Sequence, residues 1–349
     1  MRDRLAHLLD EGRGFAAYRL PGEEVVHAIW QEEPRRHLFY DMEDLNGRCG
    51  FAIVPFSLSS NHPGILLQPE HQATFAAPSG GSAIPAGRFP FQAIAPDYAA
   101  RFAAFITPLQ ERRFKKLVLS RSLTVERSES FSPVETFLRA CRAYPLSYVC
   151  LCHAQQAGTW LGCSPEMLLS GKNNRWQTVA IAGTSPASAC GSLEAWDGKN
   201  REEQRLVADY IREKLNSLGI FPEEKGPYPV AAGNLAHLRT DFYFTLPASK
   251  RLGSLLASLH PTPAVSGLPQ KEAVSFIREN EGYDRKYYSG FTGMFDPEGK
   301  SNLYVNLRCM NINGRKLTLY AGGGLLPSST PDCEWQETID KLQTIYSII

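Results

Sequence analysis

The stretch from Tyr320 to Lys341 combines residues that could bind an anion and a metal ion. A run of three glycines, residues 322–324, follows a strand-like segment. Glycine lets the backbone approach a ligand and direct its amide groups at a carboxylate or phosphate. We therefore expect a loop at these glycines, followed by a helix over residues 332–346 that begins after a proline- and serine-rich turn.

Three charged residues of this predicted helix share one stripe beside its apolar face. At about 100° per residue, Glu334, Glu337 and Lys341 fall together. Two structures fit this stripe. One is an exposed Glu337–Lys341 ion pair, which contributes a few tenths of a kcal/mol. The other is half of a metal site beside the glycines. The helix pattern favours the first, and the neighbouring glycine run favours the second.

Three further charged residues stand in apolar surroundings. Glu203 projects near the middle of the apolar face of a helix predicted over residues 200–218, where a carboxylate is costly unless it is paired or bound to metal. Glu166 precedes a run of large apolar residues, and it either faces water or lies in an apolar pocket with a raised pKa, ready to donate a proton. Lys116 begins a predicted strand and is either a solvated strand end or, in a cavity, a general base.

The elements that must position these residues can be read from periodicity and turn residues. We predict helices over residues 96–111, 133–143, 254–259 and 271–280, and strands over residues 115–125, 147–152, 178–185 and 242–244. The segments 287–295, 303–311 and 315–320, separated by turn sequences, predict a meander. Gly183 and Thr184 end a strand and either bind a polar group or simply make a turn. Residues 78–90 are rich in proline and glycine and predict a surface loop.

Composition narrows the class of protein. The 349 residues include 37 Lys and Arg against 36 Asp and Glu, so no global field attracts nucleic acid or an anionic membrane. The charged start of the chain resembles no export signal, and no run of 18 apolar residues occurs. The eight cysteines lack paired spacing, as in reduced cytoplasmic proteins. The segment 150–153, Cys-Leu-Cys-His, is the one cluster resembling metal ligands, and no second pair completes a zinc site.

Several motifs occur in one order between residues 116 and 341, and together they resemble the chorismate-utilising enzymes, most closely the isochorismate synthases. These motifs are Lys116-Leu-Val-Leu-Ser-Arg121, Ser164-Pro-Glu166, Ala182-Gly-Thr184, Leu259-His-Pro-Thr-Pro-Ala-Val-Ser-Gly267, Tyr288-Ser-Gly290, Tyr320-Ala-Gly-Gly-Gly324 and Glu334-Trp-Gln-Glu-Thr-Ile-Asp-Lys341. The resemblance implies an α+β fold, a single large domain of two packed, mostly antiparallel β-sheets flanked by helices. The domain would span residues 1–349, with residues 1–90 as a variable N-terminal part and residues 91–349 as the catalytic core.

The resemblance also implies an activity, the magnesium-dependent isomerisation of chorismate to isochorismate. Lys116 matches the base that activates water to attack C2, and Glu166 matches the acid that protonates the departing C4 hydroxyl. Glu203 and Glu337 match the Mg²⁺ ligands, and Glu334 reaches the metal through water. The groups that match substrate-binding positions are Thr184, His237, Ala264, Arg308, Gly322, Gly323, Gly324 and Lys341.

The chain departs from the family pattern at three positions, with Asn200 in place of Asp, Gln204 in place of His and Gly323 in place of Ala. The first two flank Glu203, so they bear on metal affinity. Ala264 favours the isomerase, because relatives that go on to release pyruvate tend to carry Thr there. A salicylate-forming lyase and a non-catalytic chorismate-binding paralogue remain as alternatives. Without the resemblance, Glu166 and a second acid would also suit a carboxylate-pair hydrolase.

The sequence leaves other properties of the protein open. It does not distinguish a monomer from a dimer, and it carries no marker of the pathway served, which is menaquinone or siderophore biosynthesis. We expect a cytoplasmic protein that acts on a small molecule, with no nucleic acid or membrane partner.

Overall fold

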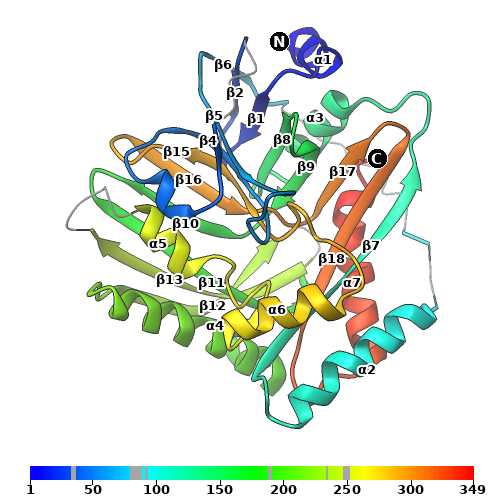
Figure 1. Cartoon of the computed structure of the whole chain (residues 1–349). Helices are drawn as coiled ribbons and strands as arrows, with labels where there is room; N and C mark the ends of the chain where they lie inside the picture. Colours follow the sequence, from blue (N-terminus) through cyan, green and yellow to red (C-terminus); the bar gives the residue numbers. More distant parts are fainter. Residues whose placement is uncertain (33–36, 79–88, 91–92, 188–190, 233–234, 247–251) are drawn as a thin grey trace.

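The computed structural model describes residues 1–32, 37–78, 89–90, 93–187, 191–232, 235–246 and 252–349, and these residues form two sheets with helices on their outer faces (Figure 1). Each sheet has nine strands, and every strand pair in the described residues is antiparallel. The predicted α+β class with two mostly antiparallel sheets is therefore confirmed. Most of the proline-rich segment 78–90 lies outside the described residues.

The first sheet has the order β14 (Gly267–Leu268), β7 (Lys116–Glu126), β18 (Lys316–Leu325), β17 (Cys309–Asn313), β9 (Gly158–Ser164), β8 (Tyr148–Ala154), β1 (Phe15–Arg19), β2 (Val25–Trp30) and β6 (His71–Ala76). The second has the order β12 (Glu223–Ala232), β13 (Leu235–Thr245), β11 (Arg175–Pro186), β10 (Met167–Lys172), β16 (Lys300–Val305), β15 (Phe291–Phe295), β4 (Gly50–Val54), β5 (Gly64–Leu67) and β3 (Leu38–Phe39). Strands from the first 76 residues thus complete both sheets.

The described helices are α1 (Arg2–Asp10), α2 (Pro96–Gln110), α3 (Pro133–Ala143), α4 (Gly198–Ser217), α5 (Leu252–Leu259), α6 (Gln270–Asn280) and α7 (Pro331–Tyr346), with short 3₁₀ turns η1 (Met42–Leu45) and η3 (Leu193–Ala195). Helix α7 packs on β18, and α4 packs on β11 and β13, as Figure 1 shows. None of the helices in the described part of the chain is long and apolar enough to cross a membrane.

The apolar core lies in three layers. One cluster joins the first sheet to α1, α2, α3 and α7, and a second joins the second sheet to α4 and α5. A third cluster, rich in aromatic side chains, lies between the sheets. There the rings of Tyr148 and Tyr304 stack with centroids 4.3 Å apart and connect β8 to β16. Stacked aromatic pairs add to the area that they bury, so this contact helps to fix how the two sheets pack.

Helix α4 begins slightly earlier than predicted. Its N-cap is Asp197, whose side chain accepts a hydrogen bond from the backbone amide of Asn200. A capping carboxylate satisfies one of the amides that have no partner within the helix. The predicted apolar face is buried, and Glu203 is buried with it. The helix therefore carries its one inward carboxylate toward β7 and β18.

Two predictions about the C-terminal strands are wrong. The glycines 322–324 lie within β18, because this strand pairs with β7 as far as Leu325. The predicted meander is split between the sheets. The segment 303–311 is two strands, because the chain leaves β16 after Val305 and enters β17 in the other sheet at Cys309. Arg308, just before β17, has a left-handed backbone conformation with φ +47°, which marks the turn at this crossover.

Candidate active site

A small cavity of about 60 Å³ lies where β7 and β18 of the first sheet meet β11 of the second sheet and helix α4. Residues of both sheets line it. The predicted site residues that line the cavity are Glu166, Thr184, Glu203, His237, Ala264, Arg308, Gly322, Gly324 and Lys341. The remaining predicted residues, Lys116, Gly323, Glu334 and Glu337, adjoin them through the contacts described below. The fold therefore brings together residues that lie far apart in the sequence.

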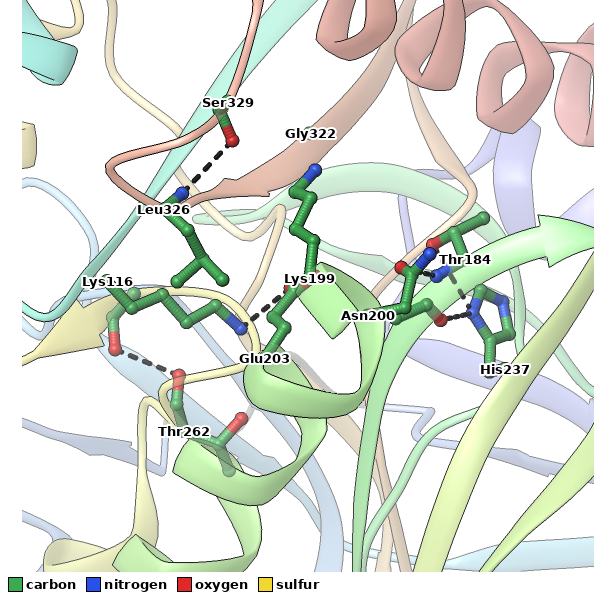
Figure 2. Close-up of polar contacts among 12 residues, drawn as sticks. Lys116, Thr184, Lys199, Asn200, Glu203, His237, Thr262, Gly322, Leu326 and Ser329 are labelled. Carbon is green, nitrogen blue, oxygen red and sulfur yellow. Dashed lines mark hydrogen bonds and ion pairs between the residues drawn. The ribbon is translucent and has the colours of Figure 1, made fainter. Parts of the chain in front are cut away.

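Lys116 and Glu203 form an ion pair at the base of this cavity. Lys116 is the first residue of β7 and is fully buried, and its Nζ lies 2.9 Å from Oε1 of Glu203. Figure 2 shows the lysine reaching across to the helix. A Cβ at Gly324 would lie only 2.0 Å from the same Glu203 oxygen. Glycine is therefore required at position 324 to leave room for the pair. The alternative of a solvated lysine at the strand start is excluded.

Glu166 is buried at another side of the cavity. Only 4% of its surface is exposed, and Thr262 Oγ1 donates to its Oε1 over 3.4 Å. Burial raises the pKa of Glu166 to about 7, although Lys116 and Thr262 act in the opposite direction. A carboxyl group with this pKa carries a proton for part of the time near neutral pH, which suits a general acid. Of the two alternatives for Glu166, the structure therefore supports the buried pocket with a raised pKa and excludes a side chain that faces water.

The carboxylates of helix α7 are each paired with a lysine. Lys199 of α4 donates to Oε1 of Glu334 over 2.5 Å, and Lys341 donates to Oε1 of Glu337 over 2.6 Å. Glu334 is fully buried, and Glu337 is mostly so. Burial and the neighbouring Glu337 together raise the pKa of Glu334 to about 7, although Lys199 acts in the opposite direction. Burial also raises the pKa of Glu337, but Lys341 and Lys199 outweigh this effect and lower it to about 2.

Hard oxygen donors converge beside Gly323. A Cβ at this glycine would lie 3.0 Å from Glu334 Oε2 and 3.3 Å from Glu337 Oε1. In the described residues, Glu334 Oε2 is buried and has no hydrogen-bond partner. Mg²⁺ is bound in proteins through one or two carboxylates together with water and substrate oxygens. An unpartnered buried carboxylate oxygen beside the carboxylate of Glu337 thus fits a divalent cation that also takes water and substrate oxygens, whereas no group of three or more His, Cys, Asp or Glu side chains in the described residues is arranged to hold a metal ion by itself.

His237, Arg308 and Thr184 form a second group of polar contacts in the cavity wall. Arg308 Nη2 lies 3.1 Å from His237 Nε2, and His237 Nδ1 lies 2.8 Å from the carbonyl oxygen of Gly183. A guanidinium can only donate, so Nε2 must accept and Nδ1 must carry the proton. Burial, followed by Arg308 and Lys341, lowers the pKa of His237 to about 3. The imidazole is therefore neutral and holds Arg308 in place.

The glycines of β18 contribute through their backbone. Ser120 and Val118 face Gly322 and Gly324 across the β7–β18 ladder. The backbone amides of Ser120 and Val118 donate hydrogen bonds to groups outside β18. Amides alternate in direction along an antiparallel strand. Gly322 and Gly324 therefore also direct theirs away from β7, whereas Gly323 directs its amide toward β7. The carbonyl of Gly322 accepts a hydrogen bond from Lys341 over 2.8 Å.

Two of the residues that depart from the family pattern, Asn200 and Gln204, have hydrogen-bond partners other than the proposed metal ligands. Asn200 donates to Asp197 and accepts from the backbone of Thr184, and Gln204 donates to Thr240 over 2.7 Å. Neither side chain competes with Glu203. The structure thus gives no reason for these two substitutions to weaken a metal site.

Three residues of the site were not singled out from the sequence. Lys199 pairs with Glu334, Thr262 donates to Glu166, and Tyr288 lines the cavity. Lys199 lies one helical turn before Glu203, so it projects onto the same face of α4, and this spacing could have revealed it. Thr262 and Tyr288 lie within motifs that the resemblance had already marked.

Comparison with known proteins places the chain in a family. Residues 92–349 match the family model described as chorismate binding enzyme. Isochorismate synthase EntC of Escherichia coli K12 is 30% identical over 244 residues, 67% of this chain and 62% of that protein. The putative isochorismate synthase MenF of Mycobacterium tuberculosis is 33% identical over 71% of this chain and 69% of its own. The chain belongs to the chorismate-binding enzyme family.

Solved structures agree on the fold. The putative 2,3-dihydroxybenzoate-specific isochorismate synthase DhbC of Bacillus anthracis superposes with a TM-score of 0.82 at 21% identity, over 100% of this chain and 99% of that one. The menaquinone-specific isochorismate synthase MenF of E. coli superposes with a TM-score of 0.77 at 21% identity, over 96% and 88%. The chain spans about six-tenths of the length of E. coli EntC.

Proposed function

We propose that this protein catalyses the magnesium-dependent isomerisation of chorismate to isochorismate. The observation that supports this proposal most directly is the pairing of a buried lysine with a buried acid in one site. Lys116 is fully buried, and Glu166, also buried, has a pKa raised to about 7. Two relatives at 30% and 33% identity are an isochorismate synthase and a putative isochorismate synthase, which supports the same activity here.

The reaction needs both groups because water is a poor nucleophile and hydroxide is a poor leaving group. In the proposed mechanism, the reactive form has a neutral Lys116 and a protonated Glu166. Lys116 takes a proton from the water that attacks C2, while Glu166 gives a proton to the C4 hydroxyl, which leaves as water. One water molecule is added and one is lost. General acid and base catalysis by positioned side chains typically contributes factors of about 10² to 10⁴ each.

The proposed magnesium ligands are Glu203 and Glu337, with Glu334 acting through water. A bound metal ion would orient the substrate and offset its negative charge. We assign the binding of substrate carboxylates to Arg308, Lys341 and the amides of Gly322 and Gly324, and we leave out the amide of Gly323, which is directed toward β7. Arg308 is buried and held by His237, so it offers a preoriented guanidinium to a carboxylate.

The alternatives to an isomerase have less support. A salicylate-forming lyase is disfavoured by Ala264, which lines the cavity at the position where such lyases tend to carry Thr. A non-catalytic paralogue was suggested by Asn200 and Gln204, and both side chains are hydrogen-bonded to groups other than the proposed metal ligands. We also propose a cytoplasmic location and a single domain over the whole chain. The described cysteines are free thiols, which suits a reducing compartment.

Product analysis tests the proposal. The protein is incubated with chorismate and millimolar Mg²⁺, and the products are identified by chromatography and mass spectrometry, with a metal-chelated sample as control. Isochorismate should form only in the presence of Mg²⁺. If salicylate and pyruvate were the main products, the protein would be a lyase and not an isomerase. Tight binding of chorismate without turnover would indicate a non-catalytic paralogue.

A further inference from the structure

Strand β11 contains a bulge at Gly183 and Thr184. Its ladder with β13 pairs Ala182 with Leu238 and then Ser185 with Ala236, so two residues of β11 face His237 alone. A bulge leaves backbone groups outside the ladder and re-aims the side chain that it carries. Here it turns Thr184 toward the cavity, where Thr184 Oγ1 donates to Glu337 Oε1 over 3.2 Å.

The backbone groups that the bulge leaves outside the ladder have partners elsewhere. The amide of Thr184 donates to Oδ1 of Asn200 over 2.9 Å, and the carbonyl of Gly183 accepts from His237. Buried backbone groups without partners are costly. Asn200 therefore takes over a hydrogen bond that the sheet would otherwise provide, and it does so from the first turn of helix α4.

Asn200 is itself fixed by Asp197. Its Nδ2 donates to Asp197 Oδ2 over 2.7 Å, while its backbone amide donates to Oδ1 of the same carboxylate. Figure 2 shows Asn200 beside Thr184 and His237 at the start of α4. The donor and the acceptor of each of these hydrogen bonds are defined, because a carboxylate only accepts and a backbone amide only donates. The side chain at position 200 must therefore accept at one end and donate at the other.

The bulge also packs tightly against this turn of the helix. Gly183 has φ +74°, and a Cβ there would lie 3.0 Å from the carbonyl oxygen and 3.2 Å from the Cβ of Asn200. Both the left-handed backbone and the close approach require glycine. Asn200 thus contacts the bulge by packing as well as by hydrogen bonding.

We propose that Asp197 and Asn200 form a clamp that holds the Gly183–Thr184 bulge on helix α4. Through this bulge the clamp positions three groups of the site. Thr184 reaches Glu337, and Gly183 fixes the tautomer of His237, which in turn holds Arg308. Asn200 and Asp197 are positioning residues, and neither touches the reacting atoms. The inference rests on the proposed function only for its kinetic test.

The polarity of the clamp suggests a swap experiment. Asn200→Asp places two carboxylates against each other, while Asp197→Asn/Asn200→Asp reverses the direction of one hydrogen bond and still leaves an acceptor for Thr184. Asn200→Ala removes both bonds. Glu202→Gln is a matched control, because the Glu202 side chain is 45% exposed on the same helix and pairs only with Arg205 in the described residues.

We expect Asn200→Ala to lower kcat/KM roughly tenfold or more, chiefly through KM, because a buried amide loses its acceptor. Asn200→Asp should lower it about fivefold at low ionic strength and less in 0.5 M salt, because Asp197 is exposed and salt screens the repulsion. The double variant should return to within about twofold of the parent protein, as expected for two coupled residues. Glu202→Gln should stay within about twofold of the parent.

A second readout needs no ligand. The ¹⁵N shifts of the His237 ring, assigned with a His237→Gln variant, should report a proton on Nδ1 in the parent and the double variant, and a change in Asn200→Ala. The clamp is contradicted if the double variant is no better than Asn200→Asp, or if Asn200→Ala keeps the parent KM and ring shifts. If the parent makes no isochorismate, the proposed function fails, and the ring shifts still decide the clamp.

Discussion

Lys116 Nζ and Glu203 Oε1 lie 2.9 Å apart, so the proposed base contacts a proposed metal ligand. Both side chains are buried, and a buried ion pair is costly to break by removing one partner. The contact links the two halves of the mechanism, because a cation bound by Glu203 competes with the lysine for the same oxygen. It also means that changes at Lys116 affect stability as well as turnover.

Replacing Lys116 by Ala should lower turnover by about 10² to 10⁴, as expected for the loss of a positioned base. The melting temperature without metal should also fall, because Glu203 loses its counter-ion and stays buried, at a cost of about 3 kcal/mol. Added Mg²⁺ should raise the melting temperature of this variant more than that of the parent protein. Steady-state kinetics and thermal melting with and without Mg²⁺ measure both effects. Near-normal turnover would show that Lys116 is not the base.

Replacing Glu166 by Gln should leave chorismate and Mg²⁺ bound but abolish most turnover, because the amide has no proton to give. In the parent protein, activity should fall as pH rises through about 7, where Glu166 loses its proton. A pH–rate profile of both proteins tests this assignment. A parent protein whose activity stays constant from pH 6 to 9 would contradict it.

The same carboxyl group should make stability depend on pH. Its pKa rises from 4.5 to about 7 on folding, so between these values the folded protein holds a proton that the unfolded chain has lost. This contribution is fully present below about pH 4.5 and is lost as pH rises through 7. Denaturant unfolding of Glu166→Gln should therefore show a smaller loss of stability between pH 5 and 8 than the parent does. Equal losses of stability in the two proteins would show that Glu166 is not the cause of this pH dependence.

Replacing Glu337 by Ala should chiefly raise the Mg²⁺ concentration needed for activity, by about tenfold or more, because it removes a proposed ligand and not a proton carrier. Isothermal titration with Mg²⁺ gives the affinity without requiring turnover. Gln336→Ala is a suitable control, since Gln336 is exposed on the same helix. An unchanged Mg²⁺ affinity in Glu337→Ala would remove this residue from the metal site.

His237 should not contribute to the pH dependence of the reaction. Its pKa is lowered to about 3, so it remains neutral at any pH at which the folded protein is assayed. Replacing His237 by Asn should raise the KM for chorismate, because Arg308 loses the acceptor that orients it, and the fall in activity near pH 7 should stay where it is. Displacement of this fall by more than about half a pH unit would point to a proton-transfer role.

Helical periodicity predicted the inward carboxylates well. The projections of Glu203 and of the Glu334–Glu337–Lys341 stripe depend only on the 3.6-residue repeat, which is local, and the structure places all four at the site. Whether a segment forms a helix or a strand could be predicted from similarly local patterns. The two sheets, by contrast, came from the resemblance, since no local pattern states which strands pair.

The predictions that failed concern contacts between distant segments. The glycine run looked like a loop, because its extended conformation depends on pairing with β7, more than 200 residues earlier. The split of residues 303–311 between two sheets depends on the crossover at Arg308, and the alternation of apolar residues from Leu303 to Cys309 conceals it. The pairing of Lys116 with Glu203 and of Lys199 with Glu334 was equally hidden, because a sequence shows which face a charge occupies but not what meets it there.

The central claim is that water attacks C2 while the C4 hydroxyl leaves, and labelled water tests it most directly. Chorismate and Mg²⁺ are incubated with the protein in H₂¹⁸O, and the product is analysed by mass spectrometry at early times. The account predicts isochorismate with one ¹⁸O atom, located at C2. Isochorismate without label would mean that the hydroxyl migrates within the substrate, and this result would contradict the roles given to Lys116 and Glu166.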